Sequence, residues 1–156
     1  MEHFREEQGF EWFWTAAFWV PAVIVGAGLV RQVASGALLW PAFVVTVAVG
    51  AWFSRLKLIT EARESGLWIS FVWLWPQRTI AWDQIRSVET RIYRPIRDFG
   101  GWGVRWAARG IVYHARGNHG VRLVLASGER ILVGSQQPDA LARAIGQRAG
   151  LPAGAA

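Results

Sequence analysis

The sequence predicts an α+β protein with a transmembrane part. An N-terminal hairpin of two membrane-spanning helices precedes a seven-stranded antiparallel curled sheet, which a C-terminal helix closes. Three observations predict this order. Residues 12–30 and 33–54 contain no charged residue. From residue 56 onward, short segments with period-two alternation replace the long apolar runs. A last amphipathic segment starts at Pro138 and stops at Gly150, the residue types that favour a helix start and a helix end.

The composition is apolar and the charge is unevenly distributed. Hydrophobic residues make up 53% of the 156 residues, and eleven residues are tryptophan. Residues 1–54 carry a net charge of −2, whereas residues 55–156 carry +8. We therefore expect the basic part to face an anionic partner, either nucleic acid or the inner leaflet of a membrane. The absence of cysteine excludes disulfides, thiol catalysis and zinc sites that use cysteine.

The two uncharged runs are long enough to cross a bilayer as helices. At 1.5 Å per residue they extend roughly 28 and 33 Å, against a hydrocarbon core of about 30 Å. Only Arg31 and Gln32 separate them, so they should form an antiparallel hairpin. Arg55 and Lys57 follow the second run and place both termini in the cytoplasm. The predicted location is the inner (cytoplasmic) membrane, as a multi-pass protein.

Two alternatives to a membrane hairpin fit less well. A chain of 156 residues is too short to wrap two fully apolar helices in a soluble core. A cleaved signal peptide normally begins with basic residues, but this chain begins MEHFREEQ. The predicted organisation is residues 1–54 as the N-terminal segment and hairpin, residues 55–150 as a cytosolic domain, and residues 151–156 as a tail.

The basic part contains seven candidate strands and one helix. Turn signals such as Ser65-Gly66 and Ser127-Gly128 separate the strands. The strands are expected at residues 56–64, 67–75, 78–82, 87–93, 110–115, 121–125 and 130–133. In the final helix, Leu141, Ile145 and Ala149 recur every four residues and form one apolar stripe.

The segments RTIAWDQIRSVE, FGGWGVR and VGSQQPDAL resemble a family of uncharacterised bacterial and archaeal membrane proteins. Members of that family have two N-terminal spans and a cytosolic pleckstrin-homology-like (PH-like) domain. The resemblance covers nearly the whole chain and implies a PH-like fold, but it implies no activity. It does not supply a phosphoinositide pocket, because the first hairpin turn reads ARESG and has no basic cluster.

An arginine-rich segment is the first candidate site. It interleaves five arginines with two tryptophans, and its candidate lipid-headgroup or interface residues are Arg91, Arg94, Arg97, Trp102, Arg105, Trp106 and Arg109. One interpretation is a loop apposed to an anionic bilayer. The other is a solvated basic loop whose tryptophan fills the mouth of the barrel. Within it, FGGWGVR lacks the pattern of a phosphate loop. We expect its glycines to permit positive φ or a close backbone approach around Trp102.

The strand at residues 67–75 is the second candidate site, because it is apolar on both faces. Such a strand needs a second covering, from the terminal helix, a bilayer surface, another subunit or a partner. The partner-patch candidates are Trp68, Val72 and Leu74. Ordinary burial within the chain is the alternative.

Catalysis finds little support in the sequence. His114 and His119 flank a glycine-rich turn and are a weak metal signal; Ser135 is expected to help cap the last helix. No motif supports nucleic-acid binding. We therefore expect no enzyme activity, cofactor, metal or small-molecule substrate. The predicted function is a membrane-anchored PH-like adaptor or scaffold that binds a protein partner or self-associates. The alternative is an anionic-lipid sensor that uses the arginine-rich segment.

Overall fold

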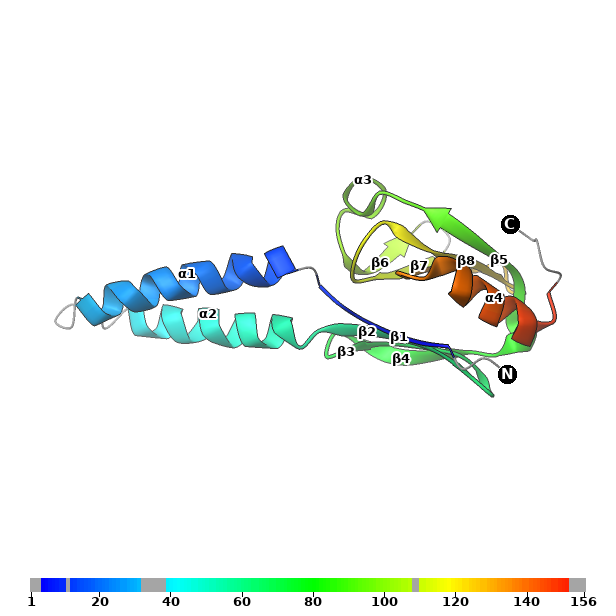
Figure 1. Ribbon diagram of the computed structural model, residues 1–156, viewed down its shortest axis with the longest axis horizontal. Helices are drawn as coiled ribbons and strands as arrows, with labels where there is room; N and C mark the ends of the chain where they lie inside the picture. The colour runs from blue at the N-terminus through cyan, green and yellow to red at the C-terminus, as the bar shows by residue number, and fades with distance from the viewer. Residues whose placement is uncertain (1–3, 11, 32–38, 108–109, 152–156) are drawn as a thin grey trace. The chain divides into compact units, whose positions relative to one another are not determined.

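The chain divides into two compact units, which are described separately. A computed structural model describes residues 4–10, 12–31, 39–107 and 110–151 (Figure 1). Phe10–Leu56 forms a helical unit, and Met1–Gly9 together with Lys57–Ala156 forms a β unit. The N-terminal segment therefore belongs to the same unit as the long C-terminal part of the chain.

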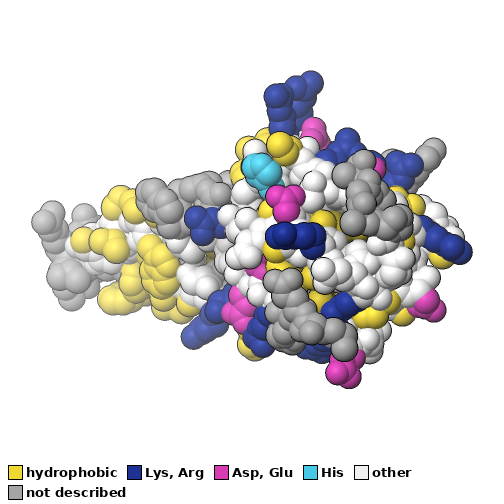
Figure 2. All heavy atoms as spheres, turned by 45° about the vertical axis from the view of Figure 1, so that its right-hand side comes forward, with side chains coloured by type: hydrophobic (Ala, Val, Ile, Leu, Met, Phe, Trp, Pro, Cys, Tyr) yellow, Lys and Arg dark blue, Asp and Glu magenta, His cyan; other side chains and the backbone are white. Residues whose placement is uncertain are grey.

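Two helices make up the helical unit, α1 (Trp12–Arg31) and α2 (Leu39–Ser54). Gly26 permits a close approach of the helices, since a Cβ there would lie 3.0 Å from Cε2 of Phe43. Ala22 is buried, but many large side chains are exposed, and apolar atoms dominate the visible surface of this unit (Figure 2). These exposed side chains are Trp19, Val20, Val23, Ile24, Trp40, Val44, Val45, Val49 and Trp52.

The prediction of two membrane-spanning helices is wrong. Within the residues that the structure describes, no helix is both long enough and apolar enough to cross a membrane. Of the second predicted span, residues 33–38 lie outside the described residues, and the described part is α2, which has 16 residues. At 1.5 Å per residue it extends about 24 Å, less than the roughly 30 Å of a hydrocarbon core. The prediction of a multi-pass location in the inner membrane with cytoplasmic termini rested on these two spans, so the same finding contradicts it.

The first sheet of the β unit is antiparallel and has the order β1-β2-β3-β4. Its strands are β1 (Arg5–Gly9), β2 (Lys57–Arg63), β3 (Gly66–Val72) and β4 (Trp75–Ile80). Alternation along β2 explains the two faces: Leu58, Thr60 and Ala62 are buried, whereas the charged residues between and beside them are not.

The second sheet has the order β5-β8-β9-β7-β6. Its strands are β5 (Ile85–Ile92), β6 (Gly103–Ala107), β7 (Gly110–His114), β8 (His119–Leu125) and β9 (Arg130–Gly134). All neighbours are antiparallel except β7 and β9, which are parallel. The connection from β5 through α3 (Pro95–Phe99) to β6 and β7 therefore adds a hairpin at the far edge of β9.

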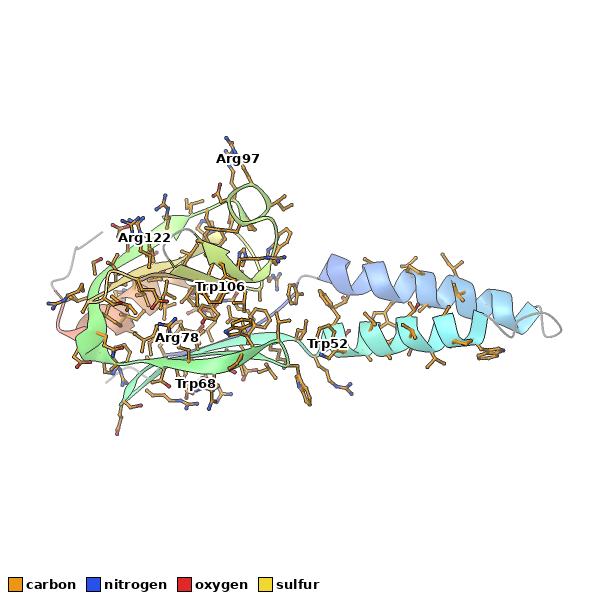
Figure 3. The ribbon with its side chains drawn as sticks, turned by 180° about the vertical axis from the view of Figure 1, so that it is seen from behind. Trp52, Trp68, Arg78, Arg97, Trp106 and Arg122 are labelled. Atoms are coloured by element: carbon orange, nitrogen blue, oxygen red, sulfur yellow. The ribbon has the colours of Figure 1, made fainter. Side chains whose placement is uncertain are left out.

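The core of the β unit draws on both sheets and on α4 (Pro138–Ala149). Phe71 of β3, Leu123 of β8 and Leu141 of α4 are fully buried. A bidentate ion pair links the sheets, since Arg78 of β4 donates to both carboxylate oxygens of Glu129 at 2.8 and 2.6 Å. Figure 3 shows Arg78 between the two sheets. This pair fixes the first sheet to the β8–β9 turn.

The N-terminal strand β1 is also fixed to the segment that leads into α4. The carboxylate of Glu6 accepts hydrogen bonds from Ser135 Oγ at 2.5 Å and from the N–H of Gln136 at 2.6 Å. Gln8 donates to the carbonyl of Gly134 at 2.8 Å. Ser135 also accepts from the N–H of Gln137 at 3.0 Å. These bonds hold together segments more than 120 residues apart in sequence.

The prediction of a single seven-stranded PH-like curled sheet is wrong, because the described residues form nine strands in two sheets. Each of the seven expected strands overlaps an observed strand, but the strand expected at residues 67–75 ends at Val72, and the chain turns at Trp73 and Leu74 before β4. The final helix is present and ends at Gly150 in the left-handed conformation with φ 66°. The additional strands are β1 and β6. The sequence of β1, REEQG, has no apolar alternation, so only its partner strand reveals it.

Candidate functional site

The arginine-rich segment folds into the end of β5, the short helix α3, a glycine turn and β6. Gly100 ends α3 with φ 71°, and its N–H donates to the carbonyl of Ile96 at 2.9 Å. Gly101 and Gly103 also have positive φ, 125° and 110°. The expectation that the glycines of FGGWGVR permit positive φ is confirmed. This motif is a helix-terminating turn that leads into a strand.

The predicted headgroup residues do not form one cluster. Arg91 faces a pocket on the five-stranded sheet, whereas Arg94 immediately precedes α3 and Arg97 projects from that helix (Figure 3). Trp102 is half-buried in the glycine turn, and Arg105 and Trp106 are exposed on β6. Arg109 lies outside the described residues. Figure 2 likewise shows Lys and Arg side chains at several separate places on the visible face.

The predicted partner patch is partly covered by the chain itself. Trp68 lies on the outward side of the four-stranded sheet (Figure 3), and the guanidinium of Arg63 stacks over its ring at 4.0 Å. Val72 is half-buried, while Leu74 is exposed in the β3–β4 turn. On the outward face of β3, Trp68 is thus covered in part by Arg63 of the neighbouring strand β2.

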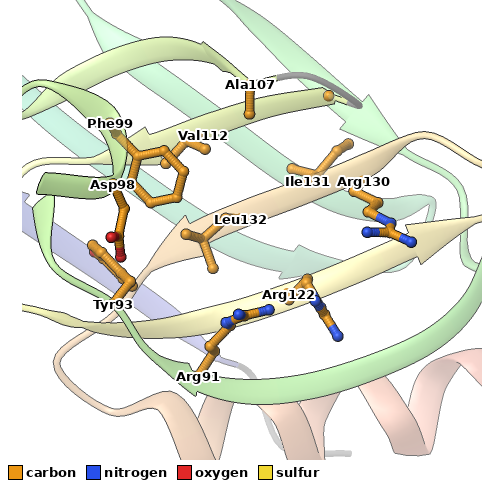
Figure 4. Close-up of a pocket in the computed structure, with 11 residues that line it drawn as sticks. Arg91, Tyr93, Asp98, Phe99, Ala107, Val112, Arg122, Arg130, Ile131 and Leu132 are labelled. Carbon is orange, nitrogen blue, oxygen red and sulfur yellow. The ribbon is translucent and has the colours of Figure 1, made fainter.

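A pocket of about 420 Å³ lies on the outward face of the five-stranded sheet (Figure 4). Three of its lining residues, Arg122, Leu132 and Val112, lie in one cross-strand row. The row continues beyond the pocket to Glu89 at one end and Arg105 at the other. Arg91 and Arg130 lie on the same face of the sheet, and Asp98 and Phe99 of α3 wall one end. The pocket therefore combines an aliphatic centre with three arginines from three strands.

The electrostatics of this pocket are basic. Arg122 donates to Glu89 at 2.5 Å and forms an ion pair with it. The carboxylate of Asp98 accepts a hydrogen bond from the backbone N–H of Arg94, at the start of α3, at 2.9 Å. Arg91 and Arg130 have no ion-pair partner among the residues that the structure describes. Two guanidinium groups are thus available to a ligand.

An aromatic cluster supports the α3 end of the pocket. Phe99, Tyr93 and His114 lie with their ring centroids 5.5–5.9 Å apart. His114 is completely buried, and burial lowers its pKa to about 4, with the positive charge of Arg105 adding to this effect and the Gly101 backbone opposing it. Burial also raises the pKa of Tyr93 above its ordinary value. The cluster is therefore neutral at pH 7 and acts as an apolar support.

A second surface feature, the aromatic patch, consists of Trp73, Leu74, Trp75 and Trp106. Trp73 is 71% exposed and has φ 64°, and Trp106 is 73% exposed. Trp75 and Trp106 meet edge to face with centroids 6.2 Å apart. Positive φ is a costly conformation for a bulky residue. The β3–β4 turn thus holds an indole in solvent at an energetic cost.

Sequence reasoning missed Arg122, Arg130, Trp73 and Trp75. The two arginines occupy separate strands and approach Arg91 only through the sheet register. A signal for the tryptophans was available in the run VWLW, which places apolar residues directly beside a turn. The residues that the structure describes contain no group of three His, Cys, Asp or Glu placed to hold a metal ion. His114 is buried, whereas His119 is exposed at the start of β8.

The comparisons with known proteins add no family or fold assignment. No protein-family model, no curated protein and no solved structure matches this chain. The resemblance to the PH-like membrane family remains a prediction, so the geometry of the pocket and of the aromatic patch is the only basis for assigning a function.

Proposed function

We propose that this chain is a non-enzymatic binding module that docks an acidic protein partner through the aromatic patch. The exposed Trp73 with its positive φ is the observation that carries the proposal. This strained, largely exposed indole buries little of its surface within the unit, and strained backbone is typical of functional sites. Tryptophan is also the residue type most enriched where partners bind most tightly.

The patch has the composition of an interface centre and its rim. Its members come from the β3–β4 turn, the start of β4 and β6, and a Cβ added at Gly103 would lie 3.8 Å from Cδ2 of Leu74. Its surroundings on the first sheet are polar, since Lys57 lies opposite Val72 at the same end of the sheet and forms an ion pair with Glu7 at 3.8 Å. Interface centres favour aromatic residues, and their rims are polar.

The net charge of the chain indicates which class of partner occupies the aromatic patch. The chain carries a net charge of +6, so the protein as a whole attracts acidic surfaces. A second copy of the chain would bring like charges together, which disfavours self-association. An acidic protein surface with an apolar centre complements both the ring faces of the patch and the net positive charge of the chain. We therefore favour an acidic protein over a second copy as the occupant of the patch.

Site-specific photo-crosslinking tests this proposal. A photoreactive phenylalanine analogue replaces Leu74 in the full-length chain, and products formed in extract of the producing organism are identified. The purified partner is then titrated against the chain. We expect an acidic partner whose affinity falls at least about tenfold in the double variant Trp73→Ser/Trp106→Ser and also falls with salt.

The variant Trp68→Ser is the matched control, because Trp68 lies on the outward side of the four-stranded sheet beneath Arg63. It should bind the partner as the unmodified chain does. Crosslinks only between copies of the chain would contradict the proposal. So would binding to vesicles of phosphatidylcholine and phosphatidylglycerol that depends on Trp73 and Trp106, because it would identify a lipid surface as the occupant.

A further inference from the structure

We propose that the pocket on the outward face of the five-stranded sheet binds a small amphiphilic anion, a carboxylate or phosphate group attached to a hydrocarbon body. This inference goes beyond docking by the aromatic patch, because the pocket lining includes none of the patch residues. It also departs from the expectation of no small-molecule ligand. The pocket's lining, charge and size each point to this class of ligand.

The three arginines lie on one side of the sheet. Cross-strand pairing aligns Arg122 with Leu132 and Arg130 with Val124, and Arg91 follows Glu89 by two residues on β5. Side chains two residues apart in a strand share a face, so all three guanidinium groups belong to one side of the sheet. Figure 4 shows them along one side of the pocket, with Phe99 and Val112 toward the other.

Positive charge remains in the pocket after internal pairing. Glu89 neutralises Arg122, and Asp98 adds one negative charge to the lining, whereas Arg91 and Arg130 have no ion-pair partner in the described part of the chain, so the balance stays positive. The Nε–H of Arg122 is also buried without an acceptor among those residues. Guanidinium groups match the geometry of carboxylate and phosphate oxygens and bind them through paired hydrogen bonds. The pocket is therefore complementary to one compact anionic group.

The remainder of the lining is apolar. Leu132, Val112 and Tyr93 form a buried cluster, and Phe99 packs against it. Apart from the arginines, the lining side chains offer few hydrogen-bonding groups, namely those of Asp98 and Tyr93. A sugar or nucleotide requires several directed polar contacts, whereas an alkyl chain or a simple ring requires none. The volume of about 420 Å³ lies within the range typical of small-molecule sites.

Isothermal titration of the full-length chain with octyl phosphate and with octanoate tests the inference. Octanol and octyltrimethylammonium have the same hydrocarbon body with a neutral or a positive head. We expect saturable binding of one or both anions, at least tenfold weaker binding of octanol, and none of the cation. The comparison of the two anions identifies the preferred head group. Vesicles of phosphatidylcholine and phosphatidylglycerol test whether the pocket binds a phosphate group in a bilayer as well as it binds free octyl phosphate.

Two exposed positions provide variants that should fold. Arg91→Gln and Arg130→Gln should each weaken octyl phosphate binding by about tenfold or more, since each removes hydrogen bonds to a charged group. Arg86→Gln is the matched control, because Arg86 is an exposed arginine on the same strand as Arg91 but outside the pocket. It should bind as the unmodified chain does.

Three results would overturn the inference: no saturable binding of either anion up to about 1 mM, equal binding of octanol, or unchanged binding in both arginine variants. Failure here is distinguishable from failure of the proposed docking function. Trp73→Ser/Trp106→Ser should leave octyl phosphate binding intact, and Arg91→Gln should leave partner docking intact.

Discussion

The outward faces of the two sheets contain similar residue types but differ in how their charges are paired. On the four-stranded sheet, Arg63 bonds Glu61 at 2.8 Å and covers Trp68, and Arg5 bonds Glu7 at 2.6 Å. On the five-stranded sheet, only Arg122 has a carboxylate partner among the described residues. The arginines on the outward face of the four-stranded sheet are thus paired with carboxylates of the same face. The outward face of the five-stranded sheet leaves guanidinium groups unpaired among the described residues, and these can bind a ligand. Pairing, not composition, distinguishes a covered face from a binding face.

The largest expected effect comes from Gly110→Ala, which should disrupt the five-stranded sheet that forms the floor of the pocket. A Cβ at Gly110 would lie 1.6 Å from the carbonyl oxygen of Arg130, so β7 would have to separate from β9. We expect a loss of more than about 4 kcal/mol in the free energy of unfolding, because only backbone movement relieves the clash. Chemical denaturation of the full-length chain measures it.

Gly9→Ala is the control on the first sheet, since a Cβ at Gly9 would meet no atom within 4 Å. It should change the free energy of unfolding by less than about 1 kcal/mol. Equal losses in the two variants would show that the parallel contact between β7 and β9 does not hold the pocket floor together.

The second largest effect should come from pH, through His114 beneath the pocket. Its folded-state pKa is about 4, below the ordinary value of 6.5. The unfolded chain therefore binds a proton that the folded chain does not bind as the pH falls from 6.5 toward 4. Stability should decrease across this window by about 3 kcal/mol at most.

Denaturation curves of the unmodified chain and of His114→Leu test this effect. The variant should lose the pH dependence between about pH 6.5 and pH 5. Below that range, carboxylates also make stability depend on pH, because the ion pair with Arg78 lowers the pKa of Glu129 below its ordinary value of 4.5. An identical slope in both proteins above about pH 5 would contradict a buried neutral His114.

A smaller effect is expected from the ion pair that joins the two sheets. Arg78→Met and Glu129→Gln remove its two charge-assisted hydrogen bonds. A double-mutant cycle should give a coupling of about 1–2 kcal/mol, since both side chains are roughly 70% buried and the contact is bidentate. A coupling near zero would show that this ion pair contributes nothing to holding the two sheets together.

The smallest effect should come from Arg63→Ala on the covered face. It removes a stacking contact and an ion pair that are both close to solvent. We expect a loss of less than about 1 kcal/mol. The loss should disappear in a background where Trp68 is replaced by serine; if it persists, stacking on that ring is not what Arg63 contributes.

The sequence was informative where the signal is local. Alternation and turn residues located seven strands, and Pro138 and Gly150 marked the ends of α4. Local signals did not reveal the parallel pairing of β7 with β9, because that register depends on chain segments that are distant in sequence. They also predicted two membrane spans, whereas no helix among the described residues is both long enough and apolar enough to cross a membrane.

The candidate site was harder to predict than the fold for the same reason. Arg91 belongs to the arginine-rich segment that sequence reasoning selected, but Arg122 and Arg130 join it only after β8 and β9 pair. The positive φ of Trp73 has no sequence signal either, because the turn VWLW contains none of the residues that favour this conformation. Sites assembled across strands require the register before they can be recognised.

The most direct test of the distinction between the two faces is the amide and arginine-side-chain NMR spectrum of the full-length chain during titration with octyl phosphate. We predict that the Nε–H signals of Arg91, Arg122 and Arg130 and the amide of Leu132 shift in a saturable manner. The signals of Arg63 and Trp68 should remain unchanged. Shifts confined to Arg63 and Trp68, or spread evenly over both sheets, would contradict the assignment of the five-stranded sheet as the binding face.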